Sequence, residues 1–116
     1  MPPLTFELPV IVLPRKHSAE TKGIKSMSSN VETTIKFVNS SKQIIKVYWL
    51  DYEGRRQFKE TLKDGDSYES NRTYLTHPWL ITDKDDNAWD IYFPDAQPRT
   101  VEIRACVAAG SDGGAP

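Results

Sequence analysis

The chain has 116 residues, a formal net charge of -1 and 27% charged residues. This length suits one domain and is too short for two domains of ordinary size. The near-neutral charge argues against a nucleic-acid or polyanion binder, which would carry a basic excess. The sequence contains no apolar run long enough to span a bilayer.

Both ends of the chain are predicted to be flexible tails. Residues 1–30 hold early prolines followed by an aperiodic polar run, and residues 109–116 are rich in glycine. Such segments bury too little apolar surface to offset the entropy lost on ordering. The single cysteine, Cys106, can form no internal disulfide, so we expect a reducing compartment, the cytoplasm or the nucleus.

Seven short strands are predicted in one domain over residues 31–108. Each run is rich in branched and aromatic residues or alternates apolar with polar positions, and turn residues separate the runs. Within residues 56–62, alternation places Phe58 and Leu62 on one face. The spacing indicates an all-β domain, a β-sandwich or a small barrel. The runs are 33–39, 44–52, 56–62, 67–74, 78–82, 88–93 and 99–107.

The sequence offers little catalytic or metal-binding apparatus. His17 falls in the predicted tail, where we expect it to be solvated. Residues 83–87 (DKDDN) lack the glycine and the distal glutamate of a calcium loop, so they are interpreted as a solvated turn. Cys106 has no histidine near it in sequence and is interpreted as a free thiol. We therefore expect no enzyme activity, no cofactor and no metal, and favour a binding module.

The stretch TYLTHPWLITD, residues 73–83, raises the question of a binding face. Pro78 favours an extended backbone, which would place His77 and Trp79 on the same face. One interpretation is a core tryptophan beside a surface histidine. The other is a small aromatic pocket with one polar handle, in which Trp49 and Trp79 wall an apolar ring and a hydroxyl and an imidazole bind its polar substituent.

The order of several motifs resembles a known family. FVNSSKQIIKVYWLDYEGRRQFKETLKDGDSY, followed by THPWLITD and IYFP, is similar to the β domain of the von Hippel-Lindau tumour suppressor over residues 35–104. The specific elements are Phe-x-Asn-x-Ser at the start, Trp-Leu-x-aromatic-acidic-Gly at 49–54 and His-x-Trp-Leu at 77–80. The resemblance implies a seven-stranded β-sandwich that binds 4-hydroxyproline in a peptide from hypoxia-inducible factor.

The resemblance also implies roles for individual residues. Trp49 and Trp79 fall where two indoles line the proline ring, and His77 falls on the imidazole that hydrogen-bonds the hydroxyl. Thr73 stands where the family has a serine as second partner of that hydroxyl, and Tyr74 matches a tyrosine that flanks the peptide groove.

One pocket position departs from the family pattern. The family's pocket tyrosine aligns with Lys59, which could donate to a carbonyl but cannot form the same wall. A slip of one residue would instead place Phe58 there, giving the ring without the hydroxyl.

These observations lead to two functional hypotheses. The first is a peptide-recognition module for a hydroxyproline-containing, hypoxia-inducible-factor-like partner. The family's tumour suppressor recruits elongin C and a cullin ligase through a helical domain, which is not expected here after residue 107, so recruitment by that route is not expected. The second is a structural or assembly module whose same face packs on a partner without hydroxyproline selectivity. The two hypotheses differ in whether the cleft between Trp49 and His77/Trp79 is open to solvent. An open cleft would favour the first hypothesis, and a cleft filled by Leu75 or Phe58 would favour the second.

Overall fold

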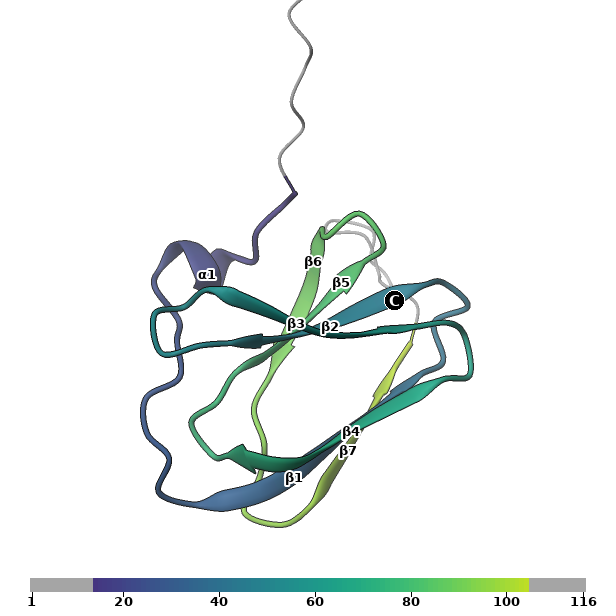
Figure 1. Ribbon diagram of the computed structural model, residues 1–116. Coiled ribbons are helices and arrows are strands. Elements are labelled where there is room, and N and C mark those ends of the chain that lie inside the picture. The colour runs from purple at the N-terminus through teal and green to yellow at the C-terminus, as the bar shows by residue number, and fades with distance from the viewer. Residues whose placement is uncertain (1–13, 105–116) are drawn as a thin grey trace, which may run out of the picture.

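A computed structural model describes residues 14–104 of the protein, which form a two-layer β-sandwich (Figure 1). One sheet has the strand order β4-β1-β7 and the other has the order β3-β2-β5-β6. Neighbouring strands are antiparallel except β1 and β7, which are parallel. The strands are β1 Glu32–Asn39, β2 Ile45–Leu50, β3 Arg56–Leu62, β4 Ser67–Tyr74, β5 Trp79–Asp83, β6 Ala88–Tyr92 and β7 Arg99–Ile103. The predicted all-β sandwich is confirmed.

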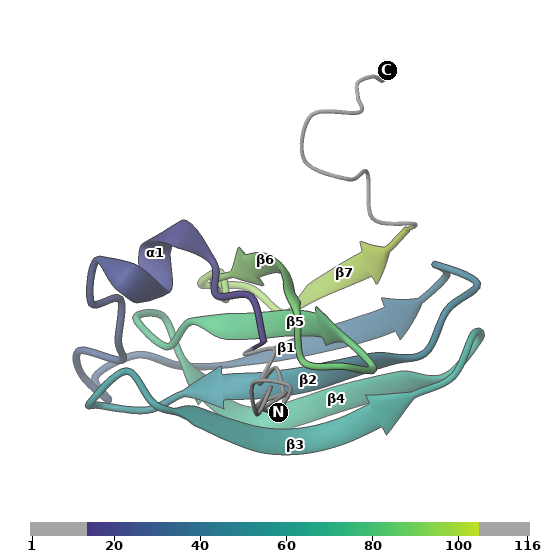
Figure 2. The ribbon, with the colours of Figure 1, turned by 90° about the horizontal axis from the view of Figure 1, so that it is seen from above.

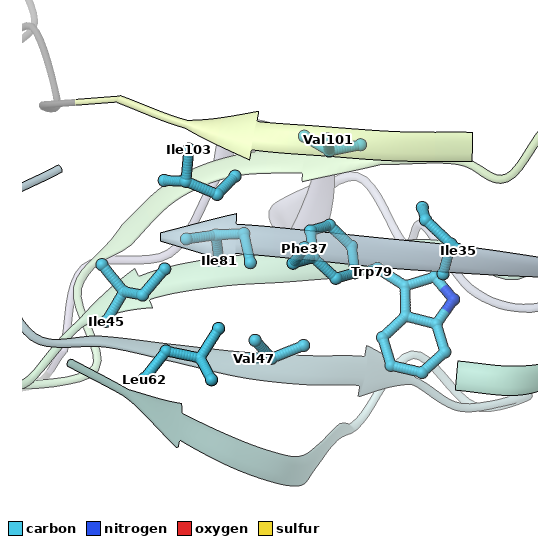
Figure 3. Packing of buried hydrophobic residues seen from close by; sticks show 9 residues of the cluster. All are labelled: Ile35, Phe37, Ile45, Val47, Leu62, Trp79, Ile81, Val101 and Ile103. Carbon is cyan, nitrogen blue, oxygen red and sulfur yellow. The ribbon is translucent and has the colours of Figure 1, made fainter. Parts of the chain in front are cut away.

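The main core lies between the two sheets. Alternate residues of β1 are buried, because one face of the strand points at the opposite sheet. Figure 3 shows Trp79 at one end of the cluster and Ile45 with Ile103 at the other. Burial of these apolar side chains is the main force that holds the layers together. The cluster comprises Ile35, Phe37, Ile45, Val47, Leu62, Trp79, Ile81, Val101 and Ile103.

A second, smaller cluster lies on the other face of the four-stranded sheet. It contains Tyr48, Leu50, Leu80 and Ala88, with Ile24 and Ile91 packed against it. These β2 and β5 residues alternate with those of the main core, so both faces of the two strands are covered. That explains why β5 shows a continuous buried run rather than alternation.

Residues 15–31, here called the strap, cover this outer face. The strap carries α1 (Ser18–Thr21) and then runs past one end of the sandwich to β1 in the other sheet (Figures 1 and 2). Arg56 anchors it with two bonds to the Glu20 carboxylate, 2.8 and 2.9 Å long. Arg15 adds a backbone bond, because its carbonyl accepts the Ala88 N–H at 2.9 Å.

The strap differs from the flexible tail expected up to residue 30. Its attachment uses ion pairs and hydrogen bonds to distant strands, and hydrophobic periodicity does not reveal such contacts. Residues 1–13 and 105–116, including Cys106 and the predicted end of the last strand, lie outside the described residues. Within residues 14–104, no helix has both the length and the apolar character needed to cross a membrane.

The Phe-x-Asn-x-Ser motif has a structural explanation. Phe37 is a core residue, and Asn39, fully buried, joins the β1–β2 turn to the β3–β4 turn. Its side-chain amide donates to the carbonyls of Gln43 (2.7 Å) and Leu62 (2.9 Å). Its side-chain oxygen accepts from the backbone N–H and the hydroxyl of Ser41. One side chain thereby satisfies polar groups of two turns at the end of the sandwich opposite the strap.

Replacing Asn39 with alanine should destabilise the fold strongly. The substitution removes the side-chain partner of the Leu62 carbonyl and of the buried Ser41 backbone N–H, which costs about 2–4 kcal/mol of unfolding free energy. Urea unfolding followed by tryptophan fluorescence measures this loss. Asn30→Ala, at an exposed position in the strap, is the matched control and should change the midpoint little. A loss in Asn39→Ala no larger than in the control would contradict this role.

Candidate functional site

A pocket of about 280 Å³ opens at the end of the sandwich where the strap passes. Its walls come from β2, β3, β4 and β5 and from the β2–β3 and β4–β5 turns, so both sheets contribute. The lining residues are Trp49, Tyr52, Lys59, Tyr68, Ser70, Arg72, Thr73, Tyr74, His77 and Trp79. Six of the seven residues predicted for the site therefore line one pocket, and Phe58 does not.

A β-bulge explains the position of Phe58. The register between β2 and β3 shifts between Val47 and Tyr48, so that Tyr48 pairs with Phe58 and Val47 with Glu60. Lys59 is the additional residue of the bulge, which directs it into the pocket. Phe58 instead packs edge-on against Tyr48 on the outer face and is 55% exposed. The predicted shared face of Phe58 and Leu62 is wrong for the same reason, because the bulge interrupts the alternation.

Trp79 forms the floor of the pocket and part of the core. It is 3% exposed, and its ring lies 6.0 Å from Phe37 and 6.2 Å from Tyr68. Its indole N–H donates to the Thr73 hydroxyl at 3.0 Å, across from the four-stranded sheet to β4. Thr73 is only 1% exposed. Its hydroxyl keeps its own proton for donation, because the bond to Trp79 uses a lone pair.

Three aromatic rings surround the imidazole of His77. The ring centroids of Trp49, Tyr52 and Tyr74 lie 5.3, 5.3 and 5.0 Å from it. Lys59 completes the wall, with Nζ 5.6 Å from the centroid of the Trp49 ring, a cation-π distance. The histidine and both tryptophans thus meet in one site, which is the pocket interpretation of TYLTHPWLITD.

The imidazole of His77 is held as a neutral acceptor. Burial lowers its pKa below 6.5, and a hydrogen bond with the Ser28 backbone opposes the shift only in part. Because that bond raises the pKa, the Ser28 group is the carbonyl, which accepts an imidazole N–H. The other ring nitrogen, Nε2, lies 3.0 Å from the Tyr52 hydroxyl. We assign the proton to Nδ1 and the acceptor lone pair to Nε2.

The strap supplies the remaining polar partners of the pocket. The Trp49 indole N–H donates to the Ser26 hydroxyl at 2.9 Å, and that hydroxyl donates to the Leu50 carbonyl. Thr76 accepts the backbone N–H groups of Met27 and Ser28. These bonds fix the strap against the β4–β5 turn, which carries His77.

Sequence reasoning missed Tyr52 as a member of the site. It is the aromatic residue of the 49–54 motif, and it belongs to the turn after β2. Nothing in the spacing indicates that the turn folds back over His77. The contact depends on how the β2–β3 and β4–β5 turns meet at the end of the sandwich.

The charge at the pocket is positive. Lys59 and Arg72 line it, and no carboxylate is among the lining residues. Arg72 pairs with Glu32 at 3.2 Å in an exposed position, where such a bond is weak.

Within residues 14–104, no group of three or more His, Cys, Asp or Glu is placed so that it could hold a metal ion. Asp83 of the DKDDN turn accepts the backbone N–H groups of Asp85 and Asn87, as expected for an ordinary turn. His17 is not simply solvated: its Nδ1 caps α1, and its Nε2 lies 3.6 Å from Asp90.

Fold and site together define a β-sandwich domain with an aromatic, hydrogen-bonding pocket. A family model described as the VHL beta domain matches residues 24–91, more than half of the chain. The chain belongs to the von Hippel-Lindau (VHL) β-domain family, which confirms the resemblance. A comparison with curated proteins found no match. The family is one of substrate-recognition domains and is not a known enzyme family.

Two threonines that face each other in the β1–β4 register provide a matched test of the pocket floor. Thr33 pairs with Thr73, yet the Thr33 hydroxyl is buried without a partner, whereas that of Thr73 binds Trp79. We expect Thr73→Val to cost about 1–3 kcal/mol, because it leaves the indole N–H unpaired. Thr33→Val should be neutral or stabilising, since it removes an unsatisfied group. Thermal unfolding of both variants measures the difference, and equal losses would contradict the assignment.

The lowered pKa of His77 predicts a pH dependence of stability. The unfolded state takes up a proton near pH 6.5 and the folded state only at lower pH. The stability that His77 contributes is therefore complete above about pH 6.5 and is lost as the pH falls below it. Urea unfolding at about pH 7.5 and 5.5 should show this decrease, and His77→Asn should reduce it. An undiminished decrease in the variant would assign it to other groups.

Proposed function

We propose that this domain binds a peptide containing 4-hydroxyproline, such as a degron of the hypoxia-inducible-factor type. The observation that carries the proposal is the neutral imidazole of His77 at the centre of an aromatic pocket. A ligand hydroxyl donates to Nε2 and accepts from the Thr73 hydroxyl, while the proline ring lies against Trp49 over the Trp79 floor. The role of substrate recognition in the family supports this use of the pocket.

The departure at Lys59 changes one contact and keeps the site usable. Its ammonium group lies over Trp49, beside the space for the ring, and can donate to the carbonyl of the bound proline residue. The flat wall of a tyrosine is lost, so less apolar area is buried at this point. We infer that the lysine fixes the peptide backbone and that hydroxyl recognition stays with His77.

An assembly role on the same face is the second candidate. The observation that favours it is the internal pairing of the pocket's polar groups, for example Trp49 with Ser26 and His77 with Tyr52. Against it, Leu75 and Phe58 are not among the lining residues and do not fill the cleft. The open volume supports the peptide hypothesis. We place the protein in the cytoplasm or the nucleus, and the proposal assigns peptide binding, not ligase recruitment, to this domain.

Fluorescence anisotropy with two labelled degron peptides tests the function. One peptide contains proline and the other contains 4-hydroxyproline at the same position. We expect the hydroxylated peptide to bind at least about tenfold more tightly, a difference of about 1.4 kcal/mol, because only it pairs with the imidazole. His77→Ala should abolish the preference while the circular dichroism spectrum stays native.

The other histidine provides the control. His17→Asn keeps a side chain that caps α1, since asparagine is among the best N-cap residues. It should bind both peptides as the unaltered protein does. Equal affinity of the folded protein for the two peptides would favour the assembly role.

A further inference from the structure

The Tyr52 hydroxyl is hydrogen-bonded to Nε2 of His77, the atom that a hydroxylated ligand would need as its acceptor. The Tyr52 oxygen lies 3.0 Å from this atom, and the Tyr52 ring stands nearly perpendicular to the imidazole, at 88°, and to the Trp49 ring, at 84°. With 44% of its surface exposed, Tyr52 lies outside the buried His77, which is 5% exposed. The phenol therefore covers the imidazole from the solvent side.

The turn that carries Tyr52 is held firmly. One oxygen of the Asp51 carboxylate accepts the backbone N–H groups of Glu53 and Arg55, both at 2.8 Å. The other accepts from the Gln57 amide at 2.8 Å. Burial opposes ionisation, but these bonds outweigh it and lower the pKa of Asp51 to about 2. The turn thus keeps its geometry across the physiological pH range.

The strap adds a second constraint on the same turn. The Ser26 N–H donates to the Asp51 carbonyl at 3.0 Å. Gly54 has a φ of +79°, and a Cβ there would lie 2.9 Å from the Ile24 carbonyl oxygen, so the strap fits closely only against glycine. The Ser29 hydroxyl also bonds to the Tyr52 hydroxyl itself. The Tyr52 side chain is thus bonded at its tip to both the strap and the imidazole.

The pairing leaves a single acceptor for two hydroxyl groups. With the proton assigned to Nδ1 on the Ser28 side, Nε2 is the ring nitrogen left to accept from a ligand. A ligand hydroxyl and the Tyr52 hydroxyl cannot both donate to one lone pair. Binding through His77 therefore requires that Tyr52 give up its bond.

We propose that Tyr52 is an internal competitor whose hydroxyl must leave His77 before a hydroxyprolyl ligand can bind there. This inference rests on the proposed function and adds one step to it, the displacement of the Tyr52 hydroxyl from His77 before the ligand binds. A ligand with a hydroxyl replaces the bond that Tyr52 loses. A prolyl ligand breaks the same bond and leaves the imidazole unpaired, so closure by Tyr52 keeps weak, non-hydroxylated peptides out of the pocket.

The test compares the unaltered protein with Tyr52→Phe and Ser29→Ala, using the same two peptides. Tyr52→Phe keeps the ring and removes only the competing hydroxyl. We expect it to bind the hydroxyprolyl peptide several-fold more tightly. The prolyl peptide should gain by a similar factor, because selectivity stays with His77. Ser29→Ala loosens the phenol without touching the pocket and should shift both affinities in the same direction by less.

Each outcome decides the proposal. Tighter binding by Tyr52→Phe supports it, and so does binding that only this variant shows. If the unaltered protein binds the hydroxyprolyl peptide and Tyr52→Phe binds it equally or more weakly, the competitor is overturned while the proposed function stands. If neither protein binds the hydroxyprolyl peptide, both fail. Nitrogen-15 NMR of the ligand-free protein provides a separate readout: the Nε2 resonance of His77 should move when the Tyr52 hydroxyl is removed, and an unmoved resonance would also overturn the proposal.

Discussion

The hydrogen bond from the Trp79 indole to the Thr73 hydroxyl ties the two sheets together at the pocket. Trp79 starts β5 in the four-stranded sheet, and Thr73 lies near the end of β4 in the other. The chain between them turns within a few residues, so the bond fixes how the β4–β5 turn bends and where it presents His77. The same indole packs on Phe37 in the core. Pocket geometry and core packing consequently both depend on the Trp79 side chain, so a change in the packing around it alters the geometry of the pocket as well.

The strap makes the site a property of three separate segments. His77 comes from the β4–β5 turn, Tyr52 comes from the β2–β3 turn, and Ser26 with Ser28 comes from the strap. The family match begins at residue 24 and so includes the part of the strap that contacts the pocket. Polar groups that would be costly to bury alone are paired there before any ligand arrives. Such a site is preorganised, and a ligand must exchange hydrogen bonds to enter it rather than simply fill an empty space.

The motifs that carry the resemblance have two different roles, one in building the fold and one in forming the pocket. Phe37 and Asn39 build the core and the turns at one end of the sandwich, and Gly54 permits the close approach of the strap. His77 and Trp49 form the pocket at the other end. A family match reports both kinds together, so it establishes the fold and the role in substrate recognition. The proposed selectivity for a hydroxyl depends on a finer point, the tautomer of His77, and the proposed affinity depends on the hydroxyl that already bonds to its Nε2 atom.

The sequence by itself determined the strands and most of the pocket. Alternation and branched residues marked seven strands, because side chains on a strand repeat every two residues. The residues from Thr73 to Trp79 were predictable because they are local in sequence. Tertiary structure alone decided the rest. The bulge at Lys59 places Phe58 on the opposite face of the sheet from Leu62, since a single inserted residue shifts the alternation. The strap and Tyr52 contribute to the site through contacts between segments that are distant in the sequence. Such contacts depend on tertiary packing and produce no periodic pattern in the sequence.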